Sequence, residues 1–447
     1  MDLVAALVKH VTHDAFLRRD GYDLRRHRTA LAASQFLSTD ELRALQLARL
    51  RDIVAAAAGH PFYRRRFRAC GFEPGDLRDF ADLARLPLLT KDDIRDGLGA
   101  TLADGYSRGE VVHKRTGGST GVPVHVDIDR AAMSLKKAAT ERHNGWAGLF
   151  PGDRLAAVWG DTSAAQPLRA RLRNAMTARA FYLDTLRFDP PHIEAFLAQV
   201  RAKRPRVLMG HAHSIFRLAE HVRDRGGKIS FGGVITTAMV LSPTERRVIE
   251  EVFRAPVFDR YGCEELSIIA SECEAHQGLH EFAEGVFVEL AGERADLPRP
   301  LILTDLSNRA MPLIRYEIGD YGVAEAGACP CGRGLPRLRE VSGREADFLF
   351  TPDRVPVFGI SILDTFIIHI PGIKQAQIVQ DRYDHLLLRV VREARFTDES
   401  LALLGRRVRE VFGERMRHEV AFVERIEPTA SGKYRFSVCR IDSGGGE

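Results

Sequence analysis

The sequence predicts an α/β protein with a large N-terminal α/β domain built on mostly parallel sheets and a small α+β domain at the C-terminus. Three observations support this prediction. The first third of the chain shows the apolar spacing of helices. From about residue 154, short apolar runs alternate with amphipathic segments, as in a largely parallel sheet covered by helices. After residue 347 this alternation restarts on a smaller scale, so we expect domains at 1–345 and 346–447.

The individual elements follow from local patterns along the chain. Ser38 and Glu41 have the spacing of a capping box, and the apolar residues after them predict a helix over 38–58. The strands expected next are LAAVWG, RVLMGH, GGVITT, APVFDRYG and PLILTDL, with helices expected over 192–204, 213–225 and 243–253. In the small domain, IKQAQIVQ and HLLLRVVR predict strands, and 397–412 predicts a helix. Sheets of this kind bind ligands in the loops at their strand ends.

Composition narrows the class of protein. The 447 residues are 45% hydrophobic and 28% charged, which is ordinary for a globular protein. The net charge of +5 is small and the arginines are scattered, so we expect no nucleic-acid partner. No run is long enough to span a bilayer, and Asp2 precedes an N-terminal stretch without the basic region of a secretory signal. We therefore expect a cytoplasmic protein whose six cysteines are thiols or metal ligands, and a homodimer is left open.

The stretch KRTGGSTGVPVHV, residues 114–126, concentrates glycines and hydroxyls. Backbone N–H groups and hydroxyls can converge on phosphate oxygens in such a loop, whereas a plain surface turn has the same composition. It is not a Walker A loop, because Val122 and Pro123 stand where that motif needs Lys and Ser or Thr. The candidate phosphate ligands are Thr116, Gly117, Gly118, Ser119, Thr120 and Gly121.

Two further stretches place carboxylates near strand ends. In FDRYGCEELS, Glu264 and Glu265 can hold Mg²⁺, or can complement the dipole at the start of a helix. In MPLIRYEIGDYG, Asp320 is expected in a Gly-Asp turn after a strand. There it can accept the two ribose hydroxyls of a nucleotide, or be part of a simple β-turn.

Two cations occupy glycine-containing stretches near the expected domain boundary and the C-terminus. Arg344, in VSGREADF, can reach a phosphate or ribose, or be part of an ordinary linker. Lys433, in PTASGKYRFS, can bring positive charge to a transition state, or be a solvated surface lysine.

The cysteines predict a structural zinc site. Cys329 and Cys331 are one residue apart, and Cys273 lies upstream with His276 and His280 close behind. Three thiolates and one histidine would complete a closed tetrahedral site. We prefer His280 to His276, because seven residues allow the chain to turn back over the metal. The alternative is a set of reduced thiols without a metal.

The order of these stretches resembles that of the adenylate-forming superfamily. Within it, the chain is most similar to the phenylacetate-CoA ligase and coenzyme F390 synthetase (CapK-like) branch. The resemblance rests on HPFYRRRF (60–67), LARLPLLTKDDIR (83–95), GGSTGVP (117–123), YGCEE (261–265), LTDLSNRAMPLIRYEIGD (303–320) and CPCGRGLPRLREVSGREADF (329–348). Together these motifs are spread over nearly the whole chain.

The resemblance implies that ATP and a carboxylate give an acyl adenylate and pyrophosphate, after which the small domain rotates and the acyl group passes to a nucleophile. By similarity, the 116–121 loop holds the β- and γ-phosphates of ATP. The other implied ligands are Tyr261 and Gly262 for adenine and the α-phosphate, Glu265 for Mg²⁺, Asp320 for the ribose, Arg344 for the ribose or phosphate, and Lys433 between the carboxylate and the α-phosphate.

Several positions depart from the family pattern and indicate a specialised member. Gly117 replaces a serine, and Glu264 replaces a Ser or Thr, which adds negative charge beside the phosphates that helps bind the metal or hinders ATP binding. Met239 stands where many relatives have Glu. At the junction, the expected pair of acids is reduced to Asp347 after Ala346, so either position is left open as the hinge.

The acid and its acceptor are less constrained by the sequence. We expect an aromatic or small acid lined by Trp159, His211, Ile235 and Met239, although each of these side chains also suits core packing. Transfer to the CoA thiol is the expected second step. One alternative is transfer to an amine or carrier protein in natural-product or capsule biosynthesis. A further alternative is an inactive nucleotide- or acyl-adenylate-binding protein, against which Lys433 argues.

Overall fold

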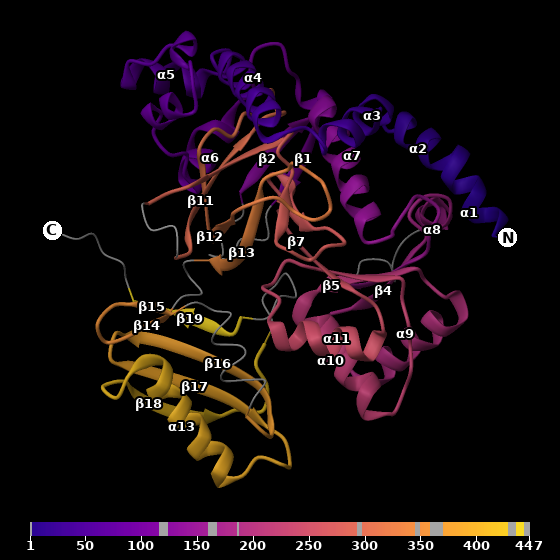
Figure 1. The fold of residues 1–447 in the computed structure, drawn as a ribbon, viewed down its shortest axis with the longest axis vertical. Helices are drawn as coiled ribbons and strands as arrows, with labels where there is room; N and C mark the ends of the chain where they lie inside the picture. Colours follow the sequence, from indigo (N-terminus) through magenta and orange to yellow (C-terminus); the bar gives the residue numbers. More distant parts are fainter. Residues whose placement is uncertain are drawn as a thin grey trace.

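The computed structural model describes residues 2–115, 124–159, 168–185, 187–292, 297–344, 349–357, 370–427 and 435–441. As predicted, its N-terminal third is mainly helical (Figure 1). The predicted capping box is present, because Glu41 N donates to Ser38 Oγ at 3.3 Å at the start of α4. The elements are α1 (Leu3–Leu7), a π-helix (Val8–Thr12), α2 (His13–Arg19), α3 (Arg25–Ser34), α4 (Thr39–Ala57), α5 (Pro61–Cys70), α6 (Lys91–Asp96) and 3-10 turns at Pro74–Asp76, Ala81–Arg85, Leu98–Ala100 and Arg108–Glu110.

A hairpin precedes the main sheet. Strands β1 (Val111–Arg115) and β2 (His125–Asp129) pair antiparallel on either side of the glycine-rich stretch. Helix α7 (Arg130–Trp146) follows directly and begins at Asp129, whose side chain accepts a hydrogen bond from Ala132 N at 2.7 Å. The hairpin therefore fixes both ends of the stretch predicted to bind phosphate.

The parallel half of the main sheet forms where apolar runs alternate with helices. Its strand order is β4-β3-β5-β6-β7, and each neighbouring pair is parallel. The strands are β3 (Leu155–Trp159), β4 (Ala180–Asp184), β5 (Val207–His211), β6 (Gly233–Thr237) and β7 (Val257–Cys263). The helices are α8 (Leu168–Ala175), α9 (Pro190–Lys203), α10 (Ala212–Asp224) and α11 (Pro243–Phe253). An apolar cluster that includes Val158, Phe196, Leu218 and Val257 packs these layers together.

The other half of the same sheet is antiparallel. From β7 the order continues β8-β9-β13-β12-β11-β10, so the described part of the sheet has eleven strands. Of these, the sequence patterns had predicted β11 and a strand directly before Asp320, which corresponds to the start of β12. The other strands were missed because short turns rather than helices join several of them. The strands are β8 (Ser267–Glu272), β9 (Leu279–Glu281), β10 (Val286–Leu290), β11 (Arg299–Asp305), β12 (Tyr316–Glu325) and β13 (Arg337–Arg344).

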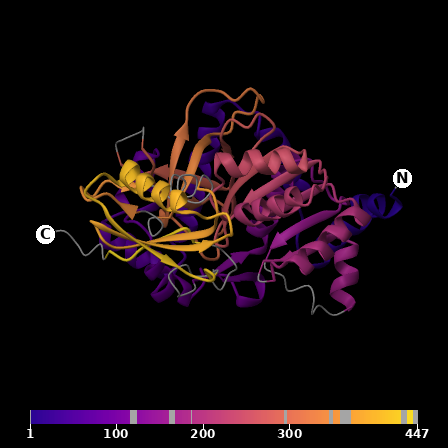
Figure 2. The same cartoon turned by 90° about the horizontal axis from the view of Figure 1, so that it is seen from below.

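The C-terminal part has its own sheet and core. The strand order is β18-β17-β16-β19, and an apolar cluster that includes Leu388, Leu404 and Phe412 joins the sheet to α13. Figure 2 shows this part at the opposite end of the molecule from the N-terminus. The elements are β14 (Leu349–Phe350), β15 (Pro356–Val357), β16 (Ile373–Arg382), β17 (His385–Arg392), α13 (Asp398–Phe412), β18 (Arg417–Phe422) and β19 (Ser437–Cys439).

The predicted fold class is confirmed: a large α/β part built on a sheet rich in parallel strands precedes a small α+β part. The exact domain limits, 1–345 and 346–447, stay a prediction, because 345–348 lie outside the described residues. In the described ranges, no helix is long and apolar enough to cross a membrane.

Candidate active site

The end of β7 and the turn that follows it carry the YGCEE residues, 261–265. Tyr261 and Gly262 lie in β7, and the strand pairing shifts register between them. A Cβ atom on Gly262 would lie 2.5 Å from the backbone oxygen of Ser267, so only glycine permits this close approach of the two strands. Ser267 itself has φ +66°, a left-handed conformation that closes the turn. The backbone therefore holds the Tyr261 ring and the two acids in one short hairpin.

Asp320 meets this hairpin from the antiparallel half of the sheet. The predicted Gly-Asp turn is wrong: Asp320 lies inside β12, because Gly319, with φ +85°, lets the strand continue through it. The side chain is only 7% exposed, and Tyr261 Oη donates to Asp320 Oδ2 at 2.7 Å. On the neighbouring strand β13, the backbone of Arg344 is opposite Asp320. Three separate sequence motifs thus meet at one place.

Glu265 is buried beside these residues. Its side chain accepts a hydrogen bond from Tyr316 Oη at 3.0 Å, and Tyr316 is itself fully buried. The neighbouring Cys263 responds to this environment, because burial and then the charge of Glu265 raise the pKa of its thiol well above the usual range. Asp320 contributes to the same shift. The carboxylates of Glu265 and Asp320 are buried beside a Cys263 thiol that keeps its proton. Such a site is suited to a hard cation, which prefers oxygen ligands.

Glu264, the unusual acid of the hairpin, pairs with a lysine. Lys114 Nζ lies 3.1 Å from Glu264 Oε2, and both side chains are partly exposed. Lys114 is near the end of β1, two residues before the candidate phosphate ligands 116–121. The extra negative charge of Glu264 is therefore opposed by a cation at the base of that stretch.

Several predicted residues cannot be placed relative to this site. Thr116, Gly117, Gly118, Ser119, Thr120, Gly121, Lys433, Ala346 and Asp347 lie outside the described residues. For Arg344 the backbone position is described and the side chain is not.

The predicted acid-binding residues are only partly brought together. Trp159 ends β3 and His211 ends β5, and their ring centroids are 4.3 Å apart. Met239 follows β6 and packs against the apolar cluster of the parallel half. Ile235, by contrast, is fully buried in a different cluster with Phe258 and Leu149. Whether these four side chains contact an acid stays a prediction.

The predicted zinc ligands do converge. The ligand atoms of Cys273, His280, Cys329 and Cys331 all lie within 4.8 Å of one another. The Cys273 and Cys329 sulfurs are 3.8 Å apart, and Cys331 Sγ is 3.3 Å from His280 Nε2. Zinc–sulfur bonds of about 2.3 Å at tetrahedral angles place two thiolates about 3.8 Å apart, so the spacing fits zinc.

The hydrogen bonding and the protonation state of His280 suit a metal ligand. His280 Nδ1 is 3.2 Å from the carbonyl oxygen of Leu335, which fixes the proton on Nδ1 and leaves the Nε2 lone pair toward the sulfurs. Burial lowers the pKa of His280 to about 4, so the ring is neutral at pH 7. His276 instead lies 3.4 Å from Glu272 and is not part of the cluster. The preference for His280 over His276 therefore agrees with the geometry.

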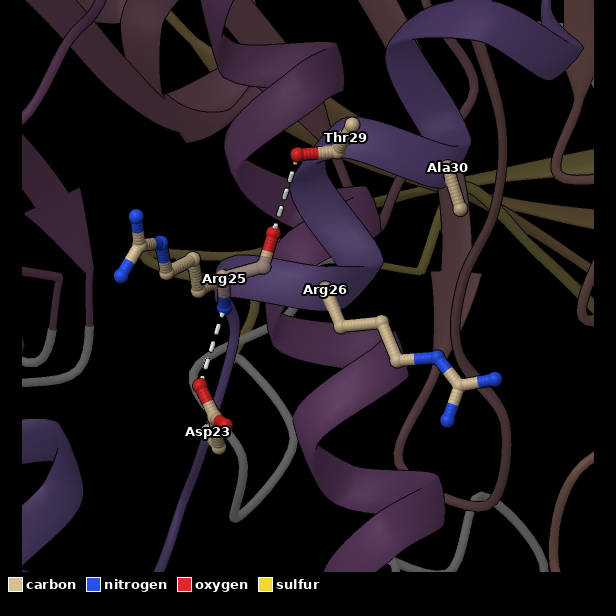
Figure 3. Close-up of a pocket in the computed structure, with 5 residues that line it drawn as sticks. All are labelled: Asp23, Arg25, Arg26, Thr29 and Ala30. Carbon is tan, nitrogen blue, oxygen red and sulfur yellow. Dashed lines mark hydrogen bonds between the residues drawn. The ribbon is translucent and has the colours of Figure 1, made fainter.

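A separate hollow lies at the start of α3 (Figure 3). Its polar contacts are local: Arg25 N donates to Asp23 Oδ1 at 3.1 Å, and Thr29 Oγ1 donates to Arg25 O at 3.4 Å. None of the predicted site residues lines it, and we assign it no ligand. The lining residues are Asp23, Arg25, Arg26, Thr29 and Ala30.

Solved structures with the same fold include a CoA ligase and an amide bond synthetase. 2-Hydroxyisobutyryl-CoA ligase in the postadenylation state, in complex with 2-HIB-AMP, matches with a TM-score of 0.74 at 22% identity, covering 91% of both chains. The same ligase in the thioesterification state, with 2-HIB-AMP and CoA, gives 0.59 at 24% identity, covering 92% of both. An amide bond synthetase from Marinactinospora thermotolerans gives 0.52 at 18% identity, covering 75% of this chain and 70% of the synthetase.

Sequence relatives agree with that fold. The family model of the CapK C-terminal domain matches residues 349–439. A phenylacetate-coenzyme A ligase from Thermus thermophilus is 28% identical over 330 residues, covering 70% of this chain and 72% of the relative. Protein CapK from Staphylococcus aureus is 23% identical over 370 residues, covering 81% of each chain. These comparisons agree with the resemblance to the adenylate-forming superfamily, and within it to the phenylacetate-CoA ligase and CapK-like branch.

Two contacts of this adenylate-forming ligase were not predicted. Tyr316, which holds Glu265, and Lys114, which pairs with Glu264, are 51 and 150 residues away from their partners in the sequence. Lys114 lies two residues before the candidate phosphate ligands 116–121, and that position was the local signal that could have identified it.

Proposed function

We propose that this ligase uses ATP to activate an aromatic or small carboxylic acid as an acyl adenylate and then passes the acyl group to the thiol of CoA. The observation that carries the proposal is the hydrogen bond from Tyr261 to Asp320, 2.7 Å long, which joins two motifs 59 residues apart. It is supported by the named relatives and by the acyl adenylate in the structural neighbour.

In the first step, a carboxylate oxygen of the acid attacks the α-phosphorus of ATP, and pyrophosphate leaves. This in-line displacement mainly needs positioning and charge neutralisation. We assign Asp320 to the ribose hydroxyls, because its buried carboxylate is oriented by Tyr261. The 116–121 stretch would bind the β- and γ-phosphates, with Tyr261, Gly262 and Arg344 around the adenine, ribose and α-phosphate.

Charge neutralisation would come from a metal and a lysine. Glu265 would hold Mg²⁺, since its carboxylate is fixed by Tyr316 at 3.0 Å, and Mg²⁺ when bound would neutralise phosphate charge. Lys433 would approach the attacking carboxylate and the α-phosphate from the C-terminal part. Glu264 would act through Lys114, with which it pairs, rather than through the metal.

In the second step, the thiol sulfur of CoA attacks the acyl carbon of the adenylate, AMP leaves and the thiol proton is released. The acid itself would lie at the carboxyl ends of β3, β5 and β6, beside the Trp159 and His211 rings, with Met239 and Ile235 from β6 and the loop after it. An amine acceptor is the second candidate, and the fold shared with an amide bond synthetase favours it over a carrier protein.

We also propose that Cys273, His280, Cys329 and Cys331 bind a structural Zn²⁺ ion. The supporting observation is the convergence of their four ligand atoms. Four protein ligands would complete a tetrahedral site, so no coordination position would remain for a catalytic water. Such a metal would tie the end of β8 and β9 to the loop between β12 and β13.

The activity can be tested directly. The full chain is incubated with ATP, Mg²⁺ and a panel of aromatic and small acids, with and without CoA, and pyrophosphate and AMP are measured. We expect pyrophosphate with at least one acid, CoA-dependent turnover, and loss of pyrophosphate release in Lys433→Ala. Pyrophosphate that forms without stimulation by CoA but with stimulation by an amine would replace the CoA proposal. No pyrophosphate with any acid would contradict the enzyme assignment.

A further inference from the structure

An aromatic contact joins the end of the C-terminal sheet to the parallel half of the large sheet. The ring centroids of Phe436 and His213 are 4.9 Å apart at an interplanar angle of 80°, which is an edge-to-face arrangement. Phe436 directly precedes β19, and His213 lies in the first turn of α10. Figure 1 shows β19 and β16 on the side of the C-terminal part that faces α10 and α11.

Each of the two residues is hydrogen-bonded within its own part of the protein. Ile378 N, in β16, donates to the backbone oxygen of Phe436 at 2.8 Å, which fixes Phe436 to the small sheet. His213 is 7% exposed, and its Nδ1 lies 2.8 Å from Glu245 Oε1. Glu245 is fully buried and also accepts from Ser242 N at 3.2 Å in the capping box of α11. The His213 ring is therefore held by a buried side-chain hydrogen bond, and the backbone of Phe436 is held by the small sheet.

Resting on the proposed function, we infer that Phe436 is a positioning residue for the adenylation step. Phe436 is three residues after Lys433 in the sequence, so the contact with His213 anchors the chain immediately beyond the lysine to the large sheet. The ring does not touch the reacting atoms. Its role is to stabilise the arrangement of the two parts in which Phe436 contacts His213.

The comparison with one ligase in two states supports this assignment. The chain matches 2-hydroxyisobutyryl-CoA ligase with a TM-score of 0.74 in the postadenylation state and 0.59 in the thioesterification state, with nearly the same share of the chain covered. Because the score is taken over both parts at once, it falls when their relative orientation differs. The Phe436–His213 contact therefore belongs to the arrangement like the postadenylation state.

The contact itself can be tested without an acid substrate. Hydrogen–deuterium exchange is measured on the full chain with Phe436→Leu, which keeps apolar volume, and with His213→Gln, which keeps a donor for Glu245. We expect faster exchange in both variants for peptides covering 212–218 and 435–439, with the β17 peptides unchanged. Phe422→Leu is the matched control, because the ring contacts of Phe422 that involve described residues are with Phe396 and Arg392 of the same part. Unchanged exchange at 212–218 in both variants would overturn the inference.

The kinetic consequence is measured separately for the two half-reactions. With phenylacetate as the probe acid, both single variants are expected to lower pyrophosphate release by about tenfold, the size of effect an aromatic contact can supply. The double variant should lose no more than either single variant, since both remove the same contact. Thioester formation from synthetic phenylacetyl adenylate and CoA should keep its wild-type rate.

The outcomes separate this inference from the proposed function. Equal losses in the two half-reactions would indicate general destabilisation, and additive losses in the double variant would indicate independent roles, so either result would overturn it. If the wild-type chain releases no pyrophosphate with phenylacetate or with any other acid of the panel, the proposed function is contradicted. The exchange measurement then still decides whether Phe436 and His213 hold the two parts together.

Discussion

The hydroxyl of Tyr261 donates to Asp320 across the two halves of the large sheet, with Oη and Oδ2 2.7 Å apart. We predict that Tyr261→Phe raises the KM for ATP by about tenfold with a smaller change in kcat, because a hydrogen bond to a charged group contributes about 1.5 kcal/mol or more. Steady-state pyrophosphate release at varied ATP measures this effect. Tyr316→Phe instead removes the hydrogen bond to Glu265. It should change how the rate of pyrophosphate release depends on the Mg²⁺ concentration. An unchanged KM for ATP in Tyr261→Phe would remove Asp320 from the ribose site.

The Lys114–Glu264 ion pair predicts opposite effects of its two partners on ATP binding. Lys114→Ala leaves Glu264 uncompensated beside the phosphates and should raise the KM for ATP several-fold. Glu264→Thr removes the negative charge and should lower the KM for ATP. Because both side chains are partly exposed, neither change should shift the free energy of unfolding by more than about 1 kcal/mol. The same direction of KM change in both variants would contradict the pairing.

The cysteine cluster predicts one zinc ion per purified chain by metal analysis. The double variant Cys329→Ser and Cys331→Ser, and the single variant His280→Asn, should lose the metal and lower the unfolding temperature by about 5–10 °C. The matched controls are His276→Asn, outside the cluster, and Cys70→Ser, at an exposed position; both should retain zinc. Zinc retained in the double variant would contradict the assignment.

Asp259 predicts a pH dependence of stability. Burial, then the charge of Glu272, raises the pKa of its carboxyl to about 7. A raised folded-state pKa means that the folded chain holds the proton more tightly than the unfolded chain. The resulting stability is fully present below the unfolded pKa of about 3.9 and is lost as pH rises through about 7. The expected loss from this group between pH 5 and pH 7 is about 2 kcal/mol.

This pH dependence is measured by denaturant unfolding of the wild type and Asp259→Asn. The amide keeps an acceptor for Thr236 Oγ1, which donates to Asp259 at 3.0 Å. The variant should gain stability relative to the wild type as the pH rises from 5 to 8. A stability difference that is constant across this range would show that Asp259 does not titrate there.

How much of the fold could be predicted depended on the connections between strands. Val207–His211 and Gly233–Thr237 were recognisable because the amphipathic helix Ala212–Asp224 separates them and identifies a parallel unit. Ser267–Glu272 was not recognised, because it follows β7 after a turn of only three residues and no amphipathic helix separates the two strands. The Gly-Asp turn was misread for a related reason: glycine at positive φ occurs both in turns and in irregular strands.

The site was predictable where chemistry is carried by local motifs. Cys329 and Cys331 identified the metal cluster by their spacing, and the structure added the position of His280 beside them. Pairings across the fold were not predictable, because the spacing between Lys114 and Glu264 is set by how β1 sits against the β7–β8 turn. Ile235 shows the remaining difficulty: an apolar residue near a strand end has the same pattern whether it lines a pocket or packs in the core.

Strand β7 pairs in parallel with β6 on one side and antiparallel with β8 on the other. On the proposed assignment, the acid lies on the β6 side and the nucleotide on the β8 side. Strand β7 therefore separates the acid-binding surface from the nucleotide-binding surface, and the two surfaces are formed by different elements. Mutations that reshape the acid surface need not alter the contacts of Asp320 or Glu265. Diversification of the acid within the family is then expected to proceed through the helices and loops of the parallel half, while the nucleotide half changes slowly.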